Sequence, residues 1–168
     1  LFTTVIEDEP LGTGGAIQLA LEACQTENVL IANGDTLFKI ELEKLAAIHF
    51  KQQSHCTLAL KPMQNFDRYG VVQTSEDGLI TSFKEKQFYK SGLINGGIYL
   101  LVRNDFLQKN LPQKFSFEKD YLEAFYKDAE FFGQPQDAYF IDIGIPDDLS
   151  KANNDLQQKA LAIENIDD

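Results

Sequence analysis

Two aspartates, each placed directly after an apolar segment, are the residues of this chain best suited to chemistry. Asp35 follows residues 28–32 within an Asn-Gly-Asp sequence, and Asp142 follows residues 138–141. Ligands of open α/β sheets collect beyond the carboxyl ends of strands, and Mg2+ binds one or two carboxylates together with substrate phosphates. We therefore expect Asp35 and Asp142 to share one Mg2+ ion. The alternative is a turn residue at Asp35 and a helix cap at Asp142.

A glycine-rich segment is the second candidate for ligand binding. Gly12, Thr13, Gly14 and Gly15 stand between an acidic stretch and an amphipathic helix. Glycine has no Cβ, so the backbone can approach a ligand that a side chain would block. Thr13 is suited to an N-cap, which would leave free backbone N–H groups facing whatever binds there. Together with the two aspartates, this segment predicts a nucleotide-sized cleft.

Further polar residues near predicted strand ends could bind a sugar phosphate. Glu85 and Lys86 close a predicted hairpin, where Glu85 could accept hydrogen bonds from sugar hydroxyls and a lysine could bind a phosphate. Asn95 and Gly96 stand at the start of an apolar strand, and Gly70 follows a tyrosine that could form a wall of the site. The alternatives are a solvated charge cluster, a β-bulge and a plain strand entry. His49 lies on the apolar face of a helix and is expected to be a structural histidine.

Composition limits the class of protein. The 168 residues are 43% hydrophobic and carry a formal net charge of -11, which fits one domain over residues 1–168. This acidic balance argues against a nucleic-acid partner but not against a small phosphate ligand. No apolar run approaches the ~18 residues of a membrane span, and the chain opens on no signal pattern. We expect a cytoplasmic protein without a membrane partner.

The elements that must position these residues alternate along the chain. Strands are expected over residues 3–7, 28–32 and 57–61, with helices over residues 14–25 and 42–52 between them. This alternation predicts a parallel sheet with right-handed crossovers. The later elements are a hairpin of residues 70–74 and 79–84, a central strand over 94–102, a helix from Ser116 to about 127, a strand at 138–142 and a helix opened by Pro146. The predicted fold is therefore α/β, with three layers and a mainly parallel, mixed sheet.

Six short motifs in a fixed order resemble those of the sugar-1-phosphate nucleotidyltransferases, a family with a Rossmann-like fold. The resemblance runs across nearly the whole chain, and it is greatest for the enzymes that act on heptose- or mannose-1-phosphate with GTP. The motifs are Glu7-Asp8-Glu9-Pro10-Leu11-Gly12-Thr13-Gly14-Gly15-Ala16, Asn33-Gly34-Asp35, Tyr69-Gly70-Val71-Val72, Phe83-Lys84-Glu85-Lys86, Asn95-Gly96-Gly97-Ile98-Tyr99 and Asp142-Ile143-Gly144-Ile145-Pro146.

The resemblance implies a reaction and a role for each candidate residue. An NTP, with GTP favoured, and a sugar-1-phosphate would give a nucleotide-diphospho-sugar and pyrophosphate. Asp35, Lys86 and Asp142 would be catalytic, the two aspartates binding Mg2+ and Lys86 contacting the sugar phosphate. The nucleotide would bind at Gly12, Thr13, Gly14 and Gly15, and the sugar at Gly70, Glu85, Asn95 and Gly96.

One family feature has no match in this sequence. The family begins with a strand, a glycine-rich loop containing arginine, and a Pro-Lys pair that bind the triphosphate. We therefore expect an N-terminally truncated domain that does not catalyse the reaction by itself, with an exposed sheet edge that favours self-association. Two alternatives are a non-catalytic, nucleotide-sugar-binding regulatory or partner subunit of the same fold, and a sugar-transferring enzyme with a similar sheet.

Overall fold

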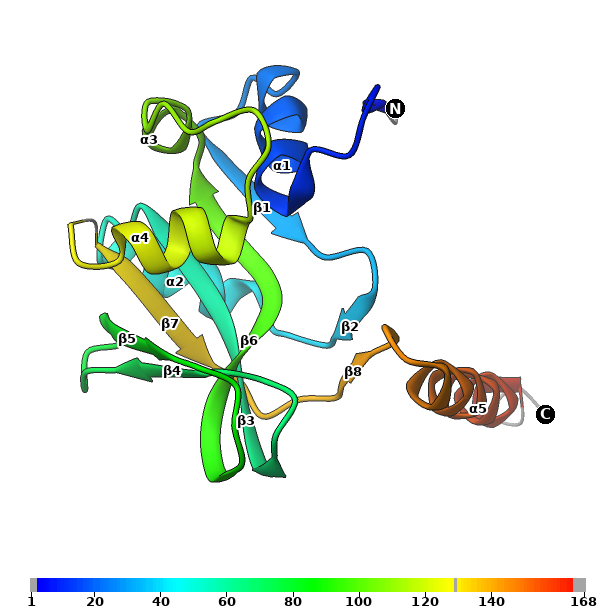
Figure 1. Cartoon of the computed structure of the whole chain (residues 1–168). Coiled ribbons are helices and arrows are strands. Elements are labelled where there is room, and N and C mark those ends of the chain that lie inside the picture. The colour runs from blue at the N-terminus through cyan, green and yellow to red at the C-terminus, as the bar shows by residue number, and fades with distance from the viewer. Residues whose placement is uncertain (1–2, 129, 165–168) are drawn as a thin grey trace.

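Four strands form the central sheet of the protein, in the order β1-β6-β3-β7 (Figure 1). The computed structural model describes residues 3–128 and 130–164. The four strands are β1 (Asn28–Ala32), β3 (Cys56–Phe66), β6 (Tyr89–Val102) and β7 (Phe131–Pro135). The long apolar segment that predicted a central strand is β6, which is hydrogen-bonded on both sides.

The sheet is mixed, and the mixed α/β fold expected from the sequence is confirmed. β6 runs antiparallel to both β1 and β3, while β3 and β7 are parallel. The strands β1, β3 and β7 therefore share one direction, and for β1 and β3 this is the parallel direction that the strand–helix alternation predicts. However, β6 inserts between β1 and β3, so two of the three pairings in this sheet are antiparallel.

Helices cover both faces of the sheet, as Figure 1 shows with α2 (Leu42–Lys51) behind it and α4 (Glu123–Phe125) in front. The alternation of side chains along β3 explains the two layers. Leu58 and Leu60 belong to the larger core cluster, which holds the aromatic side chains of the front helices. The intervening Ala59 packs in a second cluster with Leu45 of α2. The remaining helices are α1 (Gly12–Glu22), α3 (Arg103–Leu107), the π-helix η1 (Phe117–Leu122) and α5 (Pro146–Glu164).

Two short two-stranded sheets adjoin the central one, and several of the predicted site residues lie on or beside their strands. β4 (Val71–Thr74) and β5 (Ile80–Lys84) form the hairpin that the sequence predicts. β2 (Thr36–Phe38) pairs antiparallel with β8 (Phe140–Asp142), and Thr36 lies opposite Asp142 in this ladder. Residues more than 100 positions apart are thereby joined at one point of the fold.

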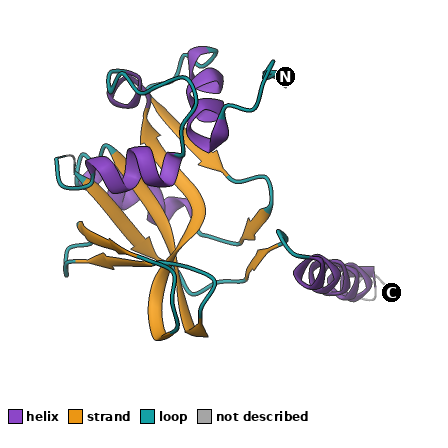
Figure 2. Cartoon of the chain, viewed as in Figure 1, coloured by secondary structure: helices purple, strands orange, loops and turns teal. Residues whose placement is uncertain are grey.

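The N-terminal part of the chain differs from the sequence prediction in two ways. Residues 3–7 are not a strand, because they are exposed along their whole length and pair with no strand among the described residues; Figure 2 shows this segment as loop. Thr13 is not the N-cap of α1, because Leu11 occupies that position and Thr13 lies within the first turn. Ser116, where the sequence predicts the start of a helix, is the N-cap of η1, and its side chain accepts a hydrogen bond from the backbone N–H of Lys119. None of the helices in the described residues is long and apolar enough to cross a membrane.

Candidate functional site

A cavity of about 570 Å³ lies between the hairpin, the central strand β6, η1 and the β2–β8 ladder. Its volume is within the range typical of small-molecule sites. Six of the residues predicted from the sequence line it: Gly70, Glu85, Lys86, Asn95, Gly96 and Asp142. The sequence therefore pointed to side chains from four separate segments that the fold brings to one space.

Asp35 and Asp142 come from the two paired strands beside this cavity. Asp35 directly precedes β2 and Asp142 ends β8, and the backbone N–H of Ile143 donates to the carbonyl of Asp35 over 2.9 Å. Asp142 is partly buried and lines the cavity, whereas Asp35 is exposed, with its carboxylate beside the hydroxyl of Thr36 at 3.3 Å. The fold thus brings the two backbones together, as the shared-metal hypothesis requires.

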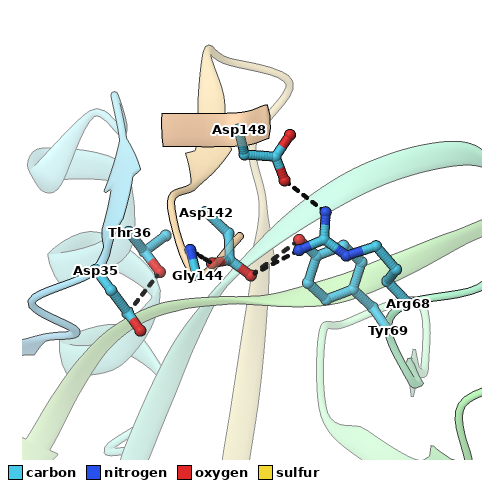
Figure 3. A network of polar contacts seen from close by, with 7 residues as sticks. All are labelled: Asp35, Thr36, Arg68, Tyr69, Asp142, Gly144 and Asp148. Atoms are coloured by element: carbon cyan, nitrogen blue, oxygen red, sulfur yellow. Dashed lines mark hydrogen bonds and ion pairs between the residues drawn. The ribbon is translucent and has the colours of Figure 1, made fainter. Parts of the chain in front are cut away.

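The carboxylate of Asp142 is held at both of its oxygens (Figure 3). Oδ1 accepts a hydrogen bond from the backbone N–H of Gly144 at 2.9 Å, and Oδ2 accepts one from the hydroxyl of Tyr69 at 3.0 Å. The guanidinium of Arg68 lies 3.7 Å from Oδ2 and also pairs with Asp148, in the first turn of α5. Each carboxylate oxygen keeps a further lone pair that can bind a cation.

The Tyr69 hydroxyl donates a hydrogen bond to Oδ2 of Asp142 in this arrangement. Burial, followed by the hydrogen bond to Asp142, raises the pKa of Tyr69 to about 12. The phenol is therefore protonated at neutral pH. Its ring is set edge-on to Phe140, with ring centroids 6.2 Å apart, and Phe140 is in turn edge-on to Phe38 across the β2–β8 ladder at 5.5 Å.

Asn95 and Gly96 lie within β6 rather than at its start, where both line the cavity and the alternative of a β-bulge is supported. The register between β3 and β6 shifts opposite this point, as expected of a β-bulge. The amide of Asn95 donates to the hydroxyl of Tyr99 at 2.8 Å and accepts from the backbone N–H of Gly97 at 3.0 Å. A Cβ at Gly96 would lie 2.5 Å from the Phe38 ring, so this glycine is needed by the packing as well as lining the cavity.

Glu85 and Lys86 extend the edge of the hairpin into solvent at the mouth of the cavity. Both are exposed. Within the part of the chain that the structure describes, neither charged group takes part in a hydrogen bond or ion pair. Glu85 contributes only its backbone carbonyl, which accepts from the hydroxyl of Tyr89 at 2.9 Å. Their charges are therefore available to a ligand.

The glycine-rich start of α1 lies outside the set of residues that line the cavity. Its glycines are explained by packing within the protein. A Cβ at Gly14 would lie 2.1 Å from the ring of Phe115, and a Cβ at Gly15 would lie 2.3 Å from the carbonyl oxygen of Gln113. Gly12 has a positive φ of 74° and would meet the Phe115 carbonyl. The assignment of Gly12, Thr13, Gly14 and Gly15 to the nucleotide stays a prediction.

Sequence reasoning missed the contribution of η1 and the adjoining α4 to the cavity. Glu118, Lys119 and Glu123 line it, and Thr13 links η1 to α1 by donating to Glu118 at 3.1 Å and accepting from Phe117 N–H at 2.9 Å. Charged residues in a predicted helix are typical of a solvated face. The π-helix that carries Glu118 and Lys119 has no recognised sequence signal, although such turns are frequent at functional sites.

No cluster of three or more acidic, histidine or cysteine side chains that could hold a metal ion occurs in residues 3–128 and 130–164. His49, the histidine expected to be structural, is buried, with its ring nitrogens 2.9 Å from Thr57 Oγ1 and 3.0 Å from Asn28 Oδ1. Both nitrogens therefore have partners within the protein.

Comparison with known proteins adds a family and several relatives. The model of the nucleotidyl transferase family matches residues 2–159. A D-glycero-alpha-D-manno-heptose 1-phosphate guanylyltransferase from Aneurinibacillus thermoaerophilus is 51% identical over 152 residues, which make up 90% of this chain and 66% of the relative. A protein of the same name from Campylobacter jejuni is 50% identical over 143 residues, covering 85% of this chain and 62% of the relative.

The solved structures include HddC from Yersinia pseudotuberculosis complexed with GMP-PN. It shares 35% identity and a TM-score of 0.78 with this chain, and the match covers 90% of this chain and 65% of that one. This chain spans slightly less than two thirds of the length of these three relatives.

Proposed function

The chain belongs to the nucleotidyl transferase family, and on this premise we propose that the protein joins GTP and a heptose-1-phosphate to give a GDP-sugar and pyrophosphate. The two relatives at 51% and 50% identity carry the name of that activity. The solved relative in complex with GMP-PN supports a guanine nucleotide as the ligand.

The observation that carries this proposal is the convergence of Glu85, Lys86, Asn95 and Asp142 on one cavity. Lys86 would bind the phosphate of the sugar as a point charge. Glu85 would accept hydrogen bonds from the sugar hydroxyls, and Asn95 can both donate and accept. The sugar would rest against the backbone at Gly70 and Gly96.

The nucleotide would bind toward the α1 side of this cavity. Thr13 connects Gly12, Gly14 and Gly15 to η1, whose Glu118 lines the cavity wall. A base held near the start of α1 would therefore lie next to the sugar pocket. Pyrophosphate leaves when an oxygen of the sugar phosphate attacks the α-phosphorus of GTP, so this chemistry needs in-line positioning and neutralisation of charge.

Asp35 and Asp142 provide the donor set that fits Mg2+, since hard carboxylate oxygens from adjacent strands suit this ion together with phosphate oxygens. Bound there, Mg2+ would neutralise the charge of the reacting phosphates. Asp142 is oriented by Gly144 and Tyr69 before any ligand arrives.

Pyrophosphate release with Mg2+ tests the proposal directly. The complete gene product and residues 1–168 are each assayed with GTP, UTP or dTTP and with heptose-, mannose- or N-acetylmuramate-1-phosphate. We expect the complete gene product to be fastest with GTP and heptose-1-phosphate. Fastest release with another nucleotide or sugar would overturn the substrate assignment. Tight binding of GDP-sugar without any release would instead support the non-catalytic binding subunit.

A further inference from the structure

We propose that Tyr69 is a positioning residue that fixes the Asp142 carboxylate for the divalent cation, and that the Arg68–Asp148 ion pair holds this arrangement together. The inference rests on the proposed function, because it assumes that Asp142 binds a metal ion. It adds to that function two side chains, Tyr69 and Arg68, that belong to no assigned ligand contact.

The orientation of the Asp142 carboxylate is set by two hydrogen bonds. A carboxylate at the end of a short strand can rotate about its side-chain bonds, and ordering it costs conformational entropy. Hydrogen bonds from Gly144 N–H to Oδ1 and from the Tyr69 hydroxyl to Oδ2 fix both oxygens at 2.9 and 3.0 Å. The Gly144 bond comes from the same loop, so Tyr69 is the donor that ties Asp142 to another part of the fold.

Tyr69 is itself held in place by two neighbouring side chains. Its ring packs edge-on against Phe140, the residue that stands two positions before Asp142 on β8. The guanidinium of Arg68 lies over the Tyr69 ring, 5.5 Å from its centroid. A side chain held by two contacts loses little further freedom when its hydroxyl orients a carboxylate.

The guanidinium of Arg68 contacts two carboxylates, those of Asp148 and Asp142. Arg68 Nη1 pairs with Asp148 on α5, while Nη2 lies 3.7 Å from Asp142 Oδ2, too far for a hydrogen bond (Figure 3). Asp148 therefore takes the direct bond of the arginine, and Asp142 keeps its lone pairs for another cation. Without Asp148, the guanidinium would be free to form a direct pair with Asp142 and compete with the metal ion.

Outer-shell partners of metal ligands typically change metal affinity by roughly 10- to 100-fold when removed. Tyr69→Phe removes the hydroxyl and keeps the ring, so we expect it to weaken Mn2+ binding by about 10-fold. Mn2+ serves as the probe, and its binding to the complete gene product with GTP is measured by electron paramagnetic resonance. Thermal unfolding of each variant is followed in parallel.

Tyr139→Phe is the matched control. Tyr139 donates to Asp155 of α5 at 2.8 Å, which is also a hydrogen bond from a tyrosine hydroxyl to a carboxylate, but one that does not involve Asp142. This control is expected to bind Mn2+ within twofold of the unmodified protein. Equal weakening in both variants would show that general loosening of α5 is responsible and would overturn the proposal. Unchanged Mn2+ affinity in Tyr69→Phe would overturn it as well.

Asp148→Ala gives the second arm, with an expected several-fold loss of Mn2+ affinity as Arg68 turns to Asp142. Asp142→Asn distinguishes an error in the proposed metal site from an error in the role of Tyr69. If Asp142→Asn binds Mn2+ as well as the unmodified protein, or if the unmodified protein binds no Mn2+, the metal site of the proposed function is wrong. If Asp142→Asn abolishes binding and Tyr69→Phe leaves it intact, only the role of Tyr69 is wrong.

Discussion

The cavity and the start of α1 use glycine and polar residues in different ways. In the cavity, side chains from β5, β6, η1 and β8 face one shared space, and the charged groups of Glu85 and Lys86 are unpaired within the described residues. At the start of α1, the glycines instead face the chain, with Gly14 and Gly15 packed against Phe115 and Gln113. Glycines in a motif therefore indicate close approach, but only the fold shows which atoms approach them.

The largest effect should come from Asp142, the cavity-lining carboxylate that we propose as a metal ligand. We expect Asp142→Asn to lower the turnover of pyrophosphate release at least about 100-fold, because losing even an outer-shell partner of a metal costs roughly 10- to 100-fold. The free energy of unfolding should change far less. Turnover within a few-fold of the unmodified protein would return Asp142 to a purely structural role.

The next effect tests whether the free charges of the cavity bind the sugar phosphate. A hydrogen bond to a charged group contributes about 1.5–3 kcal/mol, so Lys86→Ala should raise the KM for the sugar-1-phosphate at least about 10-fold while leaving the KM for GTP unchanged. Lys90→Ala is the control, because Lys90 is exposed on β6 and does not line the cavity. A larger effect on GTP than on the sugar would place Lys86 on the other substrate.

The third prediction concerns the packing of the glycines at the start of α1. In Gly14→Ala, the new Cβ would lie 2.1 Å from the Phe115 ring, so overpacking should lower the free energy of unfolding by about 1–3 kcal/mol. Gly34→Ala is the control, since nothing lies within 4 Å of its Cβ position. Urea denaturation of both variants measures the difference. Equal stabilities would show that the α1 glycines are not required by packing, and would strengthen their assignment to the nucleotide.

The smallest expected effect is the pH dependence of stability caused by His49, which lies on α2 behind the sheet, away from both regions. Burial, with a smaller contribution from His55, lowers the pKa of His49 below 6.5. The folded state therefore favours neutral His49, and its contribution to stability is complete above pH 6.5 and is lost as the pH falls toward the folded pKa. We expect the unfolding free energy to fall by less than about 1.4 kcal/mol per pH unit there. His49→Gln should flatten this slope, and an unchanged slope would assign it to other groups.

Sequence periodicity predicted most helices and the hairpin, because these depend on residues close together in the chain. α2 and the β4–β5 hairpin are where the sequence places them. The strands β2 and β7 were missed, since β2 has only three residues and β7 contains Gly133 and Pro135, residue types that are depleted in strands. The insertion of β6 between β1 and β3 could not be predicted either, because strand order depends on packing between distant segments.

The residues of the candidate site, like the elements of the fold, could be predicted only in part. The sequence by itself pointed to Asp35, Asp142, Glu85, Lys86 and Asn95, because these residues stand beside predicted strand ends and, for Glu85 and Lys86 above all, because their motifs resemble those of a known family. Only the tertiary structure decided that Tyr69 and Arg68 face Asp142 and that η1 closes the cavity wall. The physical reason is that residue type is fixed locally, whereas the direction and partners of a side chain are set by elements that pack from elsewhere in the chain.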